Sequence, residues 1–229
     1  MLIYLLRHGT TEWNAVHKIQ GDTDTSLDDI GREMARQTGL WFENQGITFD
    51  KIFSSPLKRA YNTAKLASGS EDIVVDERLR ELGFGNMEGL VVEDMLEKDK
   101  EFPFVYFKTK PDIYDEKVKN DSDAESLTQL CERTADFLHD QVEPLAKQDG
   151  SPDEKIETVL ISAHGACNKG LLMHMRGEKD MAKFWGEGLQ PNCAFDVIEY
   201  DESLGTYRIL SANNTHYDDS LTANLTKLL

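Results

Sequence analysis

The sequence contains few cysteines. Three occur among its 229 residues, they lie far apart, and no two of them form a C-x-x-C pair. An odd number of scattered cysteines excludes a disulfide framework, and the missing pair argues against a thiolate zinc site. Such a chain suits a reducing compartment, and we expect a cytoplasmic protein.

Long hydrophobic runs are also missing. The apolar stretch from Leu2 to Leu6 has no basic segment before it and meets Arg7 directly afterwards. These features exclude a signal peptide or a membrane span in this stretch. A short and continuously apolar run is instead typical of a central strand that is covered on both faces.

Positive charge is scarce. The chain has 25 basic against 42 acidic residues, which gives a formal net charge of -17. This charge repels nucleic acid and anionic membranes, so we expect neither as a partner. It also repels a phosphorylated ligand, so a phosphate site requires a local cluster of arginine and histidine. The sequence leaves the oligomeric state open.

The remaining pattern indicates one α/β domain over residues 1–229. Apolar runs of strand length alternate with amphipathic segments, which predicts a mainly parallel central sheet flanked by helices in a three-layer sandwich. In residues from about 101 to 122, the apolar residues follow neither a helical nor a strand spacing, and we interpret this segment as an insertion. Strands are expected at 2–6, 50–55, 73–75 and 158–162, helices at 27–44, 57–67, 122–147 and after Gly165, and a hairpin at 193–200 and 206–211.

Three helix starts carry local signals. Ser26 is a plausible N-cap for the helix from Leu27, and Pro56 suits the first position of the helix that follows it. Ser122 and Glu125 have the spacing of a capping box.

Two predicted strands end in the same way, as Arg7-His8-Gly9 and as Ala163-His164-Gly165. Because ligands gather beyond the carboxyl ends of parallel strands, both imidazoles are expected at one ligand-binding edge. The glycines permit close approach of a ligand or of the backbone. Neither histidine has metal-ligand spacing and no carboxylate pair accompanies them, so we expect no metal at this site.

These motifs resemble the histidine phosphatase superfamily, also called the phosphoglycerate mutase-like family. The matching blocks follow the order of the family over most of the chain. The resemblance implies a phosphoglycerate mutase-like fold and a phosphatase that acts on a phosphorylated small molecule without a cofactor. The blocks are Arg7-His-Gly-Thr-Thr-Glu-Trp-Asn14, Gln20-Gly21, Ser54-Ser-Pro-Leu-Lys-Arg-Ala60, Glu81 and His164-Gly165.

The resemblance also implies roles for the residues that match. His8 would attack phosphorus and carry the phosphoryl group, with its other ring nitrogen donating to the backbone and Arg7 lowering its proton affinity. Arg7 and Arg59 would hold the phosphoryl oxygens, because a guanidinium matches phosphate bidentately. His164 would donate to the same oxygens.

Glu81 corresponds to the general acid and base of the family, with the nearby Glu88 as a competing candidate. The resemblance places Asn14, Gln20, Gly21 and Gly165 in contact with phosphate or substrate. We prefer Glu81 to Glu88 because of its position in the matching block; the alternative for Glu81 is a solvated or salt-bridged residue, and the alternative for Asn14 is a turn residue.

Two other functions remain open. A phosphoglycerate mutase would use the same His8 but return the phosphoryl group to its substrate. The segment from Glu81 to Gly89 looks more like the phosphatase branch, and the insertion has no adjacent arginine pair. A non-catalytic module that binds a phosphorylated ligand is disfavoured because His8 and Glu81 are both present.

Substrate specificity is expected to depend on the insertion, where the match to the family is poorest. Its lysines are expected to face solvent rather than the substrate; they are Lys108, Lys110, Lys117 and Lys119.

Overall fold

The computed structural model describes residues 1–98, 104–121, 123–146 and 155–222, and its centre is a six-stranded sheet of order β3-β2-β4-β1-β5-β6. Strands β3, β2, β4 and β1 run parallel; β5 is antiparallel to β1, and β6 is antiparallel to β5. The predicted strands and the hairpin at the sheet edge are therefore confirmed. The strands are β1 (Leu2–Arg7), β2 (Lys51–Ser54), β3 (Val74–Val75), β4 (Thr158–Ala163), β5 (Phe195–Asp201) and β6 (Thr206–Asn214).

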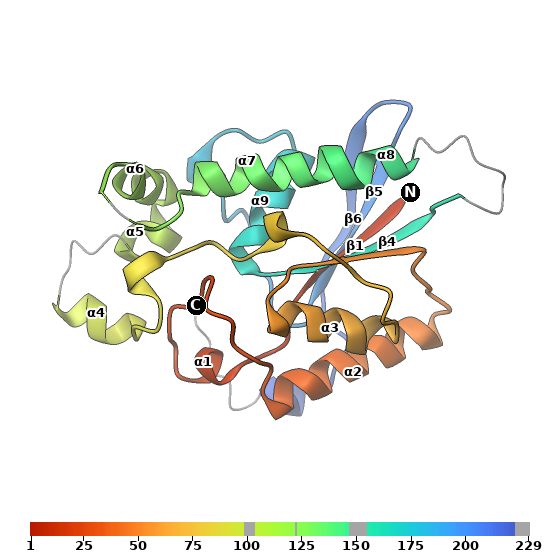
Figure 1. Ribbon diagram of the computed structural model, residues 1–229, viewed down its shortest axis with the longest axis horizontal. Helices are drawn as coiled ribbons and strands as arrows, with labels where there is room; N and C mark the ends of the chain where they lie inside the picture. The colour runs from red at the N-terminus through yellow and green to blue at the C-terminus, as the bar shows by residue number, and fades with distance from the viewer. Residues whose placement is uncertain (99–103, 122, 147–154, 223–229) are drawn as a thin grey trace.

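Helices cover both faces of the sheet, as Figure 1 shows, which confirms the three-layer α/β prediction. Ile3 and Leu5 of β1 belong to the larger core cluster, together with residues of α7 and α9. Tyr4 and Leu6 alternate with them and pack against α2 and α3 on the other face. The longer helices are α2 (Asp29–Asn44), α3 (Lys58–Ser68), α6 (Pro111–Asp121), α7 (Leu127–Phe137) and α9 (Gly165–Met175).

Shorter helical segments complete the described chain. One of them, α1, lies between β1 and α2, where no helix was predicted. A π-helical turn, η3, joins α7 to α8, so that the helix predicted to run to about residue 147 is a chain of three segments. The short segments are α1 (Glu12–Ala15), η1 (Glu77–Leu79), η2 (Gly85–Met87), α4 (Val92–Lys98), α5 (Phe104–Thr109), η3 (Leu138–Val142), α8 (Glu143–Ala146), η5 (Met181–Lys183) and η6 (Asp219–Thr222).

The predicted starts of α2 and α3 are wrong by one or two residues. Asp28, not Ser26, caps α2, because its carboxylate accepts the N–H of Gly31 at 2.6 Å. Helix α3 begins at Lys58, beyond Pro56, and the Lys58 N–H donates to the side chain of Asp24 at 2.7 Å. A loop distant in sequence thus supplies the cap that the local sequence lacks.

The predicted capping box of α7 is also wrong. Ser126 is the N-cap and forms reciprocal hydrogen bonds with Gln129, at 3.2 and 2.9 Å. Glu125 instead forms an ion pair with Arg133. Ser122 lies outside the described residues.

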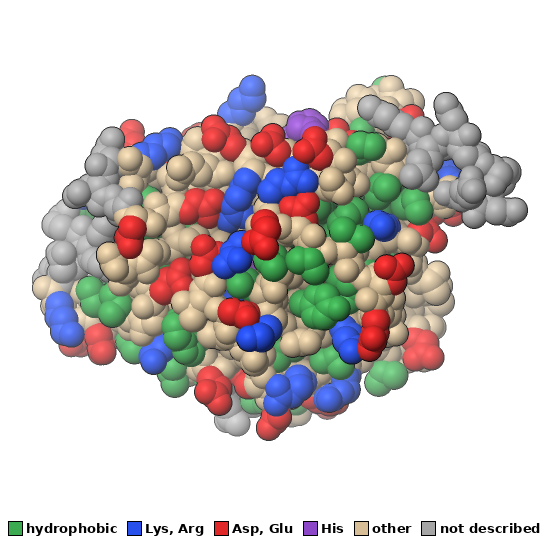
Figure 2. Space-filling view, in the orientation of Figure 1, with side chains coloured by type: hydrophobic (Ala, Val, Ile, Leu, Met, Phe, Trp, Pro, Cys, Tyr) green, Lys and Arg blue, Asp and Glu red, His purple; other side chains and the backbone are tan. Residues whose placement is uncertain are grey.

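The expected insertion forms two helices, α5 and α6, at one end of the molecule (Figure 1). Its residues 101–103 and 122 lie outside the described residues. Lys119 forms an ion pair with Asp115 at 2.7 Å, and Lys117 lies over the ring of Tyr106. On the face shown in Figure 2, acidic and basic side chains are interspersed rather than gathered by sign. None of the helices in the described ranges is both long enough and apolar enough to span a membrane.

Candidate active site

Three parallel strands end side by side and place the candidate residues together. Arg7 pairs with Ala163 in the register of β1 and β4, and Ser54 pairs with Ser162 in the register of β2 and β4. The residues that follow these strands are His8, His164 and Ser55. The two imidazole rings lie with their centres 5.1 Å apart. The strand-end argument from sequence therefore identified two residues that meet in space.

His8 presents one defined ring nitrogen to the cavity. Its Nδ1 lies 2.6 Å from the carbonyl oxygen of Gly9, which can only accept, so Nδ1 carries the proton and Nε2 has a free lone pair. The His8 backbone is also fixed, because its N–H donates to Ala163 and its carbonyl accepts from the Asn192 side chain. Burial, then the charges of Arg59 and Arg7, holds the pKa of His8 well below its usual range. His8 is therefore neutral near pH 7, and burial contributes more to this than Arg7.

Arg59 lies completely buried behind His8. Its Nη2 donates to the carbonyl of Gly21 at 2.6 Å and its Nη1 to the carbonyl of Thr23 at 2.8 Å. Its Nε is buried without a hydrogen-bond partner among the described residues. Burial lowers the pKa of Arg59 to about 10, so that it remains charged at neutral pH, and the charge of Glu81 opposes this shift. A guanidinium with unused N–H groups at this position can bind phosphoryl oxygens.

Arg7 borders the cavity beside His8. Its Nη1 donates to the carbonyl of Gln190, and its Nε has no hydrogen-bond partner within the described part of the chain. Burial lowers the pKa of Arg7, and the charge of Glu81 again opposes the shift. Two arginines with an unpaired Nε each therefore lie close enough to His8 for their charges to lower its pKa, and they form the local cationic cluster that the acidic chain requires. Arg59, unlike Arg7, is not among the described residues that line the cavity.

His164 is completely buried and is held by Ser55. The Ser55 hydroxyl accepts the N–H of Leu57 at 3.3 Å and lies 2.8 Å from Nε2 of His164. If the hydroxyl donates its proton to Nε2, then Nδ1 carries the ring proton. Nδ1 is buried and unpaired among the described residues, so the fold leaves its hydrogen-bonding capacity unused, and His164 itself is not among the described residues that line the cavity. Burial and the charge of Arg59 hold the pKa of His164 well below its usual range.

Glu81 lies at the first turn of α9. Its Oε1 accepts the N–H groups of Leu82 at 2.9 Å and of Cys167 at 3.0 Å, whereas Oε2 accepts the N–H of Ala166 at 3.2 Å. A Cβ atom on Gly165 would lie 2.7 Å from a side-chain carbon of Leu189, and at ordinary contact distances of 3.5 Å from Oε2 of Glu81 and 3.7 Å from Nε of Arg7. The glycine therefore makes room for Leu189 beside this carboxylate and this guanidinium.

The competing candidate, Glu88, has a different environment. Its Oε1 accepts the N–H of Asp22 at 2.8 Å, and its Oε2 accepts the N–H of Thr23 at 2.8 Å. Glu88 thus holds the loop whose carbonyls bind Arg59. Glu81 borders the cavity with His8, and Glu88 is not among the described residues that line it.

The residues expected to contact substrate fall into two groups. Asn14, Gln20 and Gly165 line the cavity. Gly21 lies behind the wall, where a Cβ would come within 2.5 Å of the carbonyl of Leu82, and it acts on the site through its hydrogen bond with Arg59. Asn14 also accepts the N–H of Thr11 at 3.1 Å within the capping box of α1.

The cavity has a volume of about 660 Å³ and an aromatic wall. Helix α5 of the insertion provides part of this wall. Lys108 is solvent-exposed, as expected, and it also lines the cavity, where burial followed by the charge of Arg7 lowers its pKa. The aromatic residues of the wall are Phe84, Phe104, Phe107 and Trp185.

Sequence reasoning missed several of these residues. Ser55 belongs to the matching block around Arg59, and that membership was the available signal for it. The segment Gln190–Asn192 and the aromatic residue Trp185 carried no local signal. They enter the site only because the chain after α9 returns across the ends of β1 and β4.

Comparisons with known proteins show the family of the chain. The sequence profile of the histidine phosphatase superfamily (branch 1) matches residues 3–215. A 2,3-bisphosphoglycerate-dependent phosphoglycerate mutase of Parvibaculum lavamentivorans is 31% identical over 179 residues, 76% of this chain and 79% of that protein. Phosphoserine phosphatase 1 of Hydrogenobacter thermophilus is 29% identical over 202 residues, 87% of each chain. The solved structure of Bacillus stearothermophilus YhfR matches with a TM-score of 0.77 at 26% identity, covering 93% of this chain and 97% of that one. The chain therefore belongs to the histidine phosphatase superfamily.

Proposed function

We propose that the protein is a phosphomonoesterase that hydrolyses a phosphorylated small molecule through a phosphohistidine on His8. The observation that carries this proposal is the free Nε2 of a neutral, buried His8 at the cavity, next to Arg7 and Arg59. An imidazole in this tautomer is a nucleophile, and covalent transfer divides one difficult displacement into two easier ones.

In the first step, Nε2 of His8 attacks phosphorus and the bond between phosphorus and the ester oxygen breaks. Arg7, Arg59 and Nδ1 of His164 stabilise the charge on the phosphoryl oxygens, because phosphoryl transfer depends mainly on positioning and electrostatics. Glu81 gives its proton to the leaving oxygen. Its Oε2 accepts one hydrogen bond whereas Oε1 accepts two, so Oε2 is the oxygen better placed to carry that proton.

In the second step, water attacks the phosphohistidine and Glu81 takes a proton from it. The bond between phosphorus and Nε2 breaks, inorganic phosphate leaves, and His8 returns to its neutral form. The positive charge comes from the arginines, so the proposal requires no metal ion in the cavity.

We further propose that the preferred substrate carries an apolar or aromatic group on its phosphate. The aromatic wall defined above offers apolar contacts beside the phosphate site, and Lys108 adds one positive charge there. Burying apolar surface contributes about 25 cal/mol per Å², which is enough to discriminate between esters of different size. Phosphoglycerate and phosphoserine present little apolar surface.

The identity with the Parvibaculum lavamentivorans enzyme favours a second candidate, a phosphoglycerate mutase. Both candidates use a phosphohistidine on His8, and they differ in whether water or the bound product receives the phosphoryl group. A substrate panel therefore separates them.

The test is phosphate release from naphthyl phosphate, phosphoserine and 3-phosphoglycerate, beside a mutase assay on 3-phosphoglycerate primed with 2,3-bisphosphoglycerate. We expect fastest release from naphthyl phosphate, no change after treatment with a chelator, and no turnover by His8→Ala with an unchanged circular dichroism spectrum. Isomerisation much faster than phosphate release would replace the phosphatase by the mutase. Full turnover by His8→Ala would refute the mechanism for both.

The aromatic wall has its own test. We expect Phe104→Ala to raise KM for naphthyl phosphate by about tenfold, the equivalent of about 1.4 kcal/mol, and to leave KM for phosphoserine nearly unchanged. Phe49→Ala removes an equally half-buried ring away from this cavity and is the matched control. Equal effects on both substrates would contradict the proposed substrate class.

A further inference from the structure

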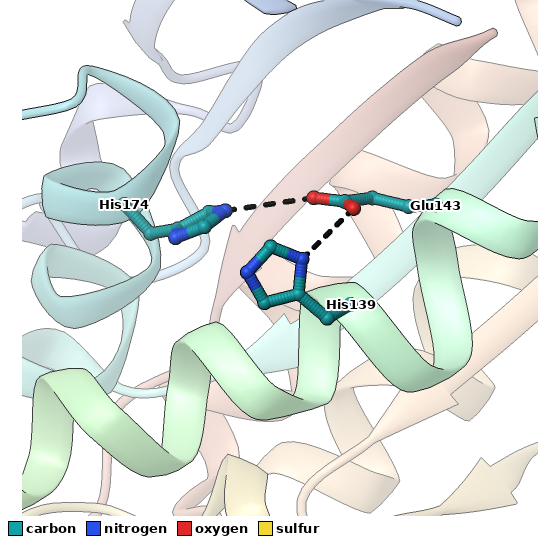
Figure 3. Close-up of side chains that lie close together, drawn as sticks. All are labelled: His139, Glu143 and His174. Carbon is teal, nitrogen blue, oxygen red and sulfur yellow. Dashed lines mark hydrogen bonds and ion pairs between the residues drawn. The ribbon is translucent and has the colours of Figure 1, made fainter. Parts of the chain in front are cut away.

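Two histidines and one glutamate form a cluster remote from the cavity residues, and we call it the His–Glu–His cluster (His139, Glu143 and His174). Figure 3 shows their side chains pointing toward one another, His139 and Glu143 from the helix that contains η3 and α8, and His174 from α9. Nδ1 of His139 lies 2.9 Å from Oε2 of Glu143, and Nε2 of His174 lies 3.5 Å from Oε1. One nitrogen or oxygen atom from each residue lies within 4.8 Å of the others.

The donor types in this cluster select a class of cation. Imidazole nitrogen is a ligand for zinc and related transition metals, whereas magnesium and calcium require oxygen ligands. Two histidines and one carboxylate form a common three-residue set for zinc, with water as the fourth ligand. Zinc binds each ligand at about 2.0–2.2 Å, so two of its ligands lie at most about 4.4 Å apart. Donors already within 4.8 Å of one another need only a small side-chain adjustment to become ligands of one ion.

The fold fixes the cluster from several sides. Tyr207 of β6 donates its hydroxyl proton to Oε1 of Glu143 at 2.8 Å, which orients the carboxylate as outer hydrogen bonds orient metal ligands. The side chains of Glu143 and His174 are 16% and 23% exposed, while that of His139 is 55% exposed and leaves the cluster open to solvent. His139 belongs to the π-helical turn η3, and such turns occur frequently at functional sites.

We propose that the His–Glu–His cluster binds a divalent transition metal of the zinc class. The site joins α8 to the last turn of α9, the helix whose first turn holds Glu81. None of the three residues is among those described as lining the cavity of His8. A metal that bridges these two helices in the folded protein alone would stabilise the fold.

The experiment is a calorimetric titration of the full chain, freed of metal by chelator and dialysis, with Zn²⁺, and a parallel titration with Co²⁺ followed by visible absorption. We expect one equivalent to bind, with d–d bands typical of nitrogen and oxygen ligands. His139→Asn and His174→Asn should each weaken binding by at least about tenfold, judging from the effect of losing even outer contacts to a metal site. Circular dichroism verifies the folding of each variant.

Two controls distinguish the cluster from other histidines. His216→Asn removes a histidine that stacks on Trp41, outside the cluster, and His8→Ala removes the imidazole pair of the cavity. Binding should persist in both. Loss of binding in His8→Ala with retention in His139→Asn and His174→Asn would overturn the proposal, and so would a dissociation constant above about 1 mM for the unaltered chain. Because the readout is metal binding, the outcome is independent of the phosphatase proposal.

Discussion

Ser55 provides a test of how the site holds His164. The Ser55 hydroxyl is completely buried, and it lies between the N–H of Leu57 and Nε2 of His164. By donating to Nε2, it would leave the proton on Nδ1, the nitrogen proposed to donate to a phosphoryl oxygen. Ser55→Ala removes this preference and leaves the ring free to place its proton on either nitrogen. We expect the variant to fold and to turn over more slowly.

The size of the effect follows from the hydrogen bond that is lost. A neutral hydrogen bond of this kind contributes about 1 kcal/mol net, and leaving its buried partners unpaired raises the cost to about 1–3 kcal/mol of stability. If about 1–2 kcal/mol of this energy serves to keep the ring proton on Nδ1 of His164, its loss lowers kcat by about 5- to 30-fold. Removing the donor itself, in His164→Ala, should reduce kcat by about a hundredfold or more.

The assay is a double-mutant cycle in kcat on the best ester of the panel. If Ser55 acts through His164, then Ser55→Ala has little further effect once His164→Ala is present. Ser54→Ala is the matched control, because Ser54 is equally buried and its hydroxyl donates to the carbonyl of Ser55 rather than to a ring. Reductions in kcat that multiply in the double variant would refute the positioning role.

Three further outcomes are expected. His164→Asn should flatten the decline in stability between about pH 6.5 and pH 5. Burial keeps His164 neutral in the folded protein, whereas in the unfolded chain this histidine takes up a proton below about pH 6.5. The free energy of unfolding of the unaltered protein therefore falls by up to about 1.4 kcal/mol per pH unit as the pH decreases. Urea unfolding measures this, and an unaltered slope would contradict it. Gly21→Ala places a Cβ within 2.5 Å of the Leu82 carbonyl, so melting should show a loss of about 1–3 kcal/mol, and kcat should fall with it. An unchanged melting temperature would oppose this packing argument. Arg59→Lys should lower kcat on the order of a hundredfold, because one ammonium cannot bind the carbonyls of Gly21 and Thr23 and a phosphoryl group together. Equal turnover of the two proteins would show that the guanidinium geometry is unimportant.

The buried central strand and the shared edge of two strand ends were accessible from local patterns. The apolar run from Leu2 to Leu6 indicated a strand covered on both faces, and its alternating side chains do pack in two different core clusters. The Arg7-His8-Gly9 and Ala163-His164-Gly165 strand ends indicated one edge, because parallel strands align their carboxyl ends. These features depend on the spacing of apolar residues and on the direction of the strands, and both can be inferred from the sequence by itself.

Helix starts were less accessible because several polar residues compete for each cap. Asp28 was preferred over Ser26 since its carboxylate also accepts the Thr10 hydroxyl, and Lys58 is capped by Asp24, which is distant in sequence. Local propensity does not include such partners. The choice between neighbouring candidates is made by contacts that form only on folding.

The sequence by itself determined the fold class, the strand-end histidines and, through the family motifs, the residues proposed for catalysis. The tertiary structure alone decided that Ser55 holds His164 and that helix α5 supplies part of the aromatic wall, and it placed Glu81, which the family motif already favoured over Glu88, at the cavity. The physical reason is range: a period or a motif is encoded within a few neighbouring residues. A shared cavity, in contrast, depends on how segments far apart in the chain pack against the same sheet edge.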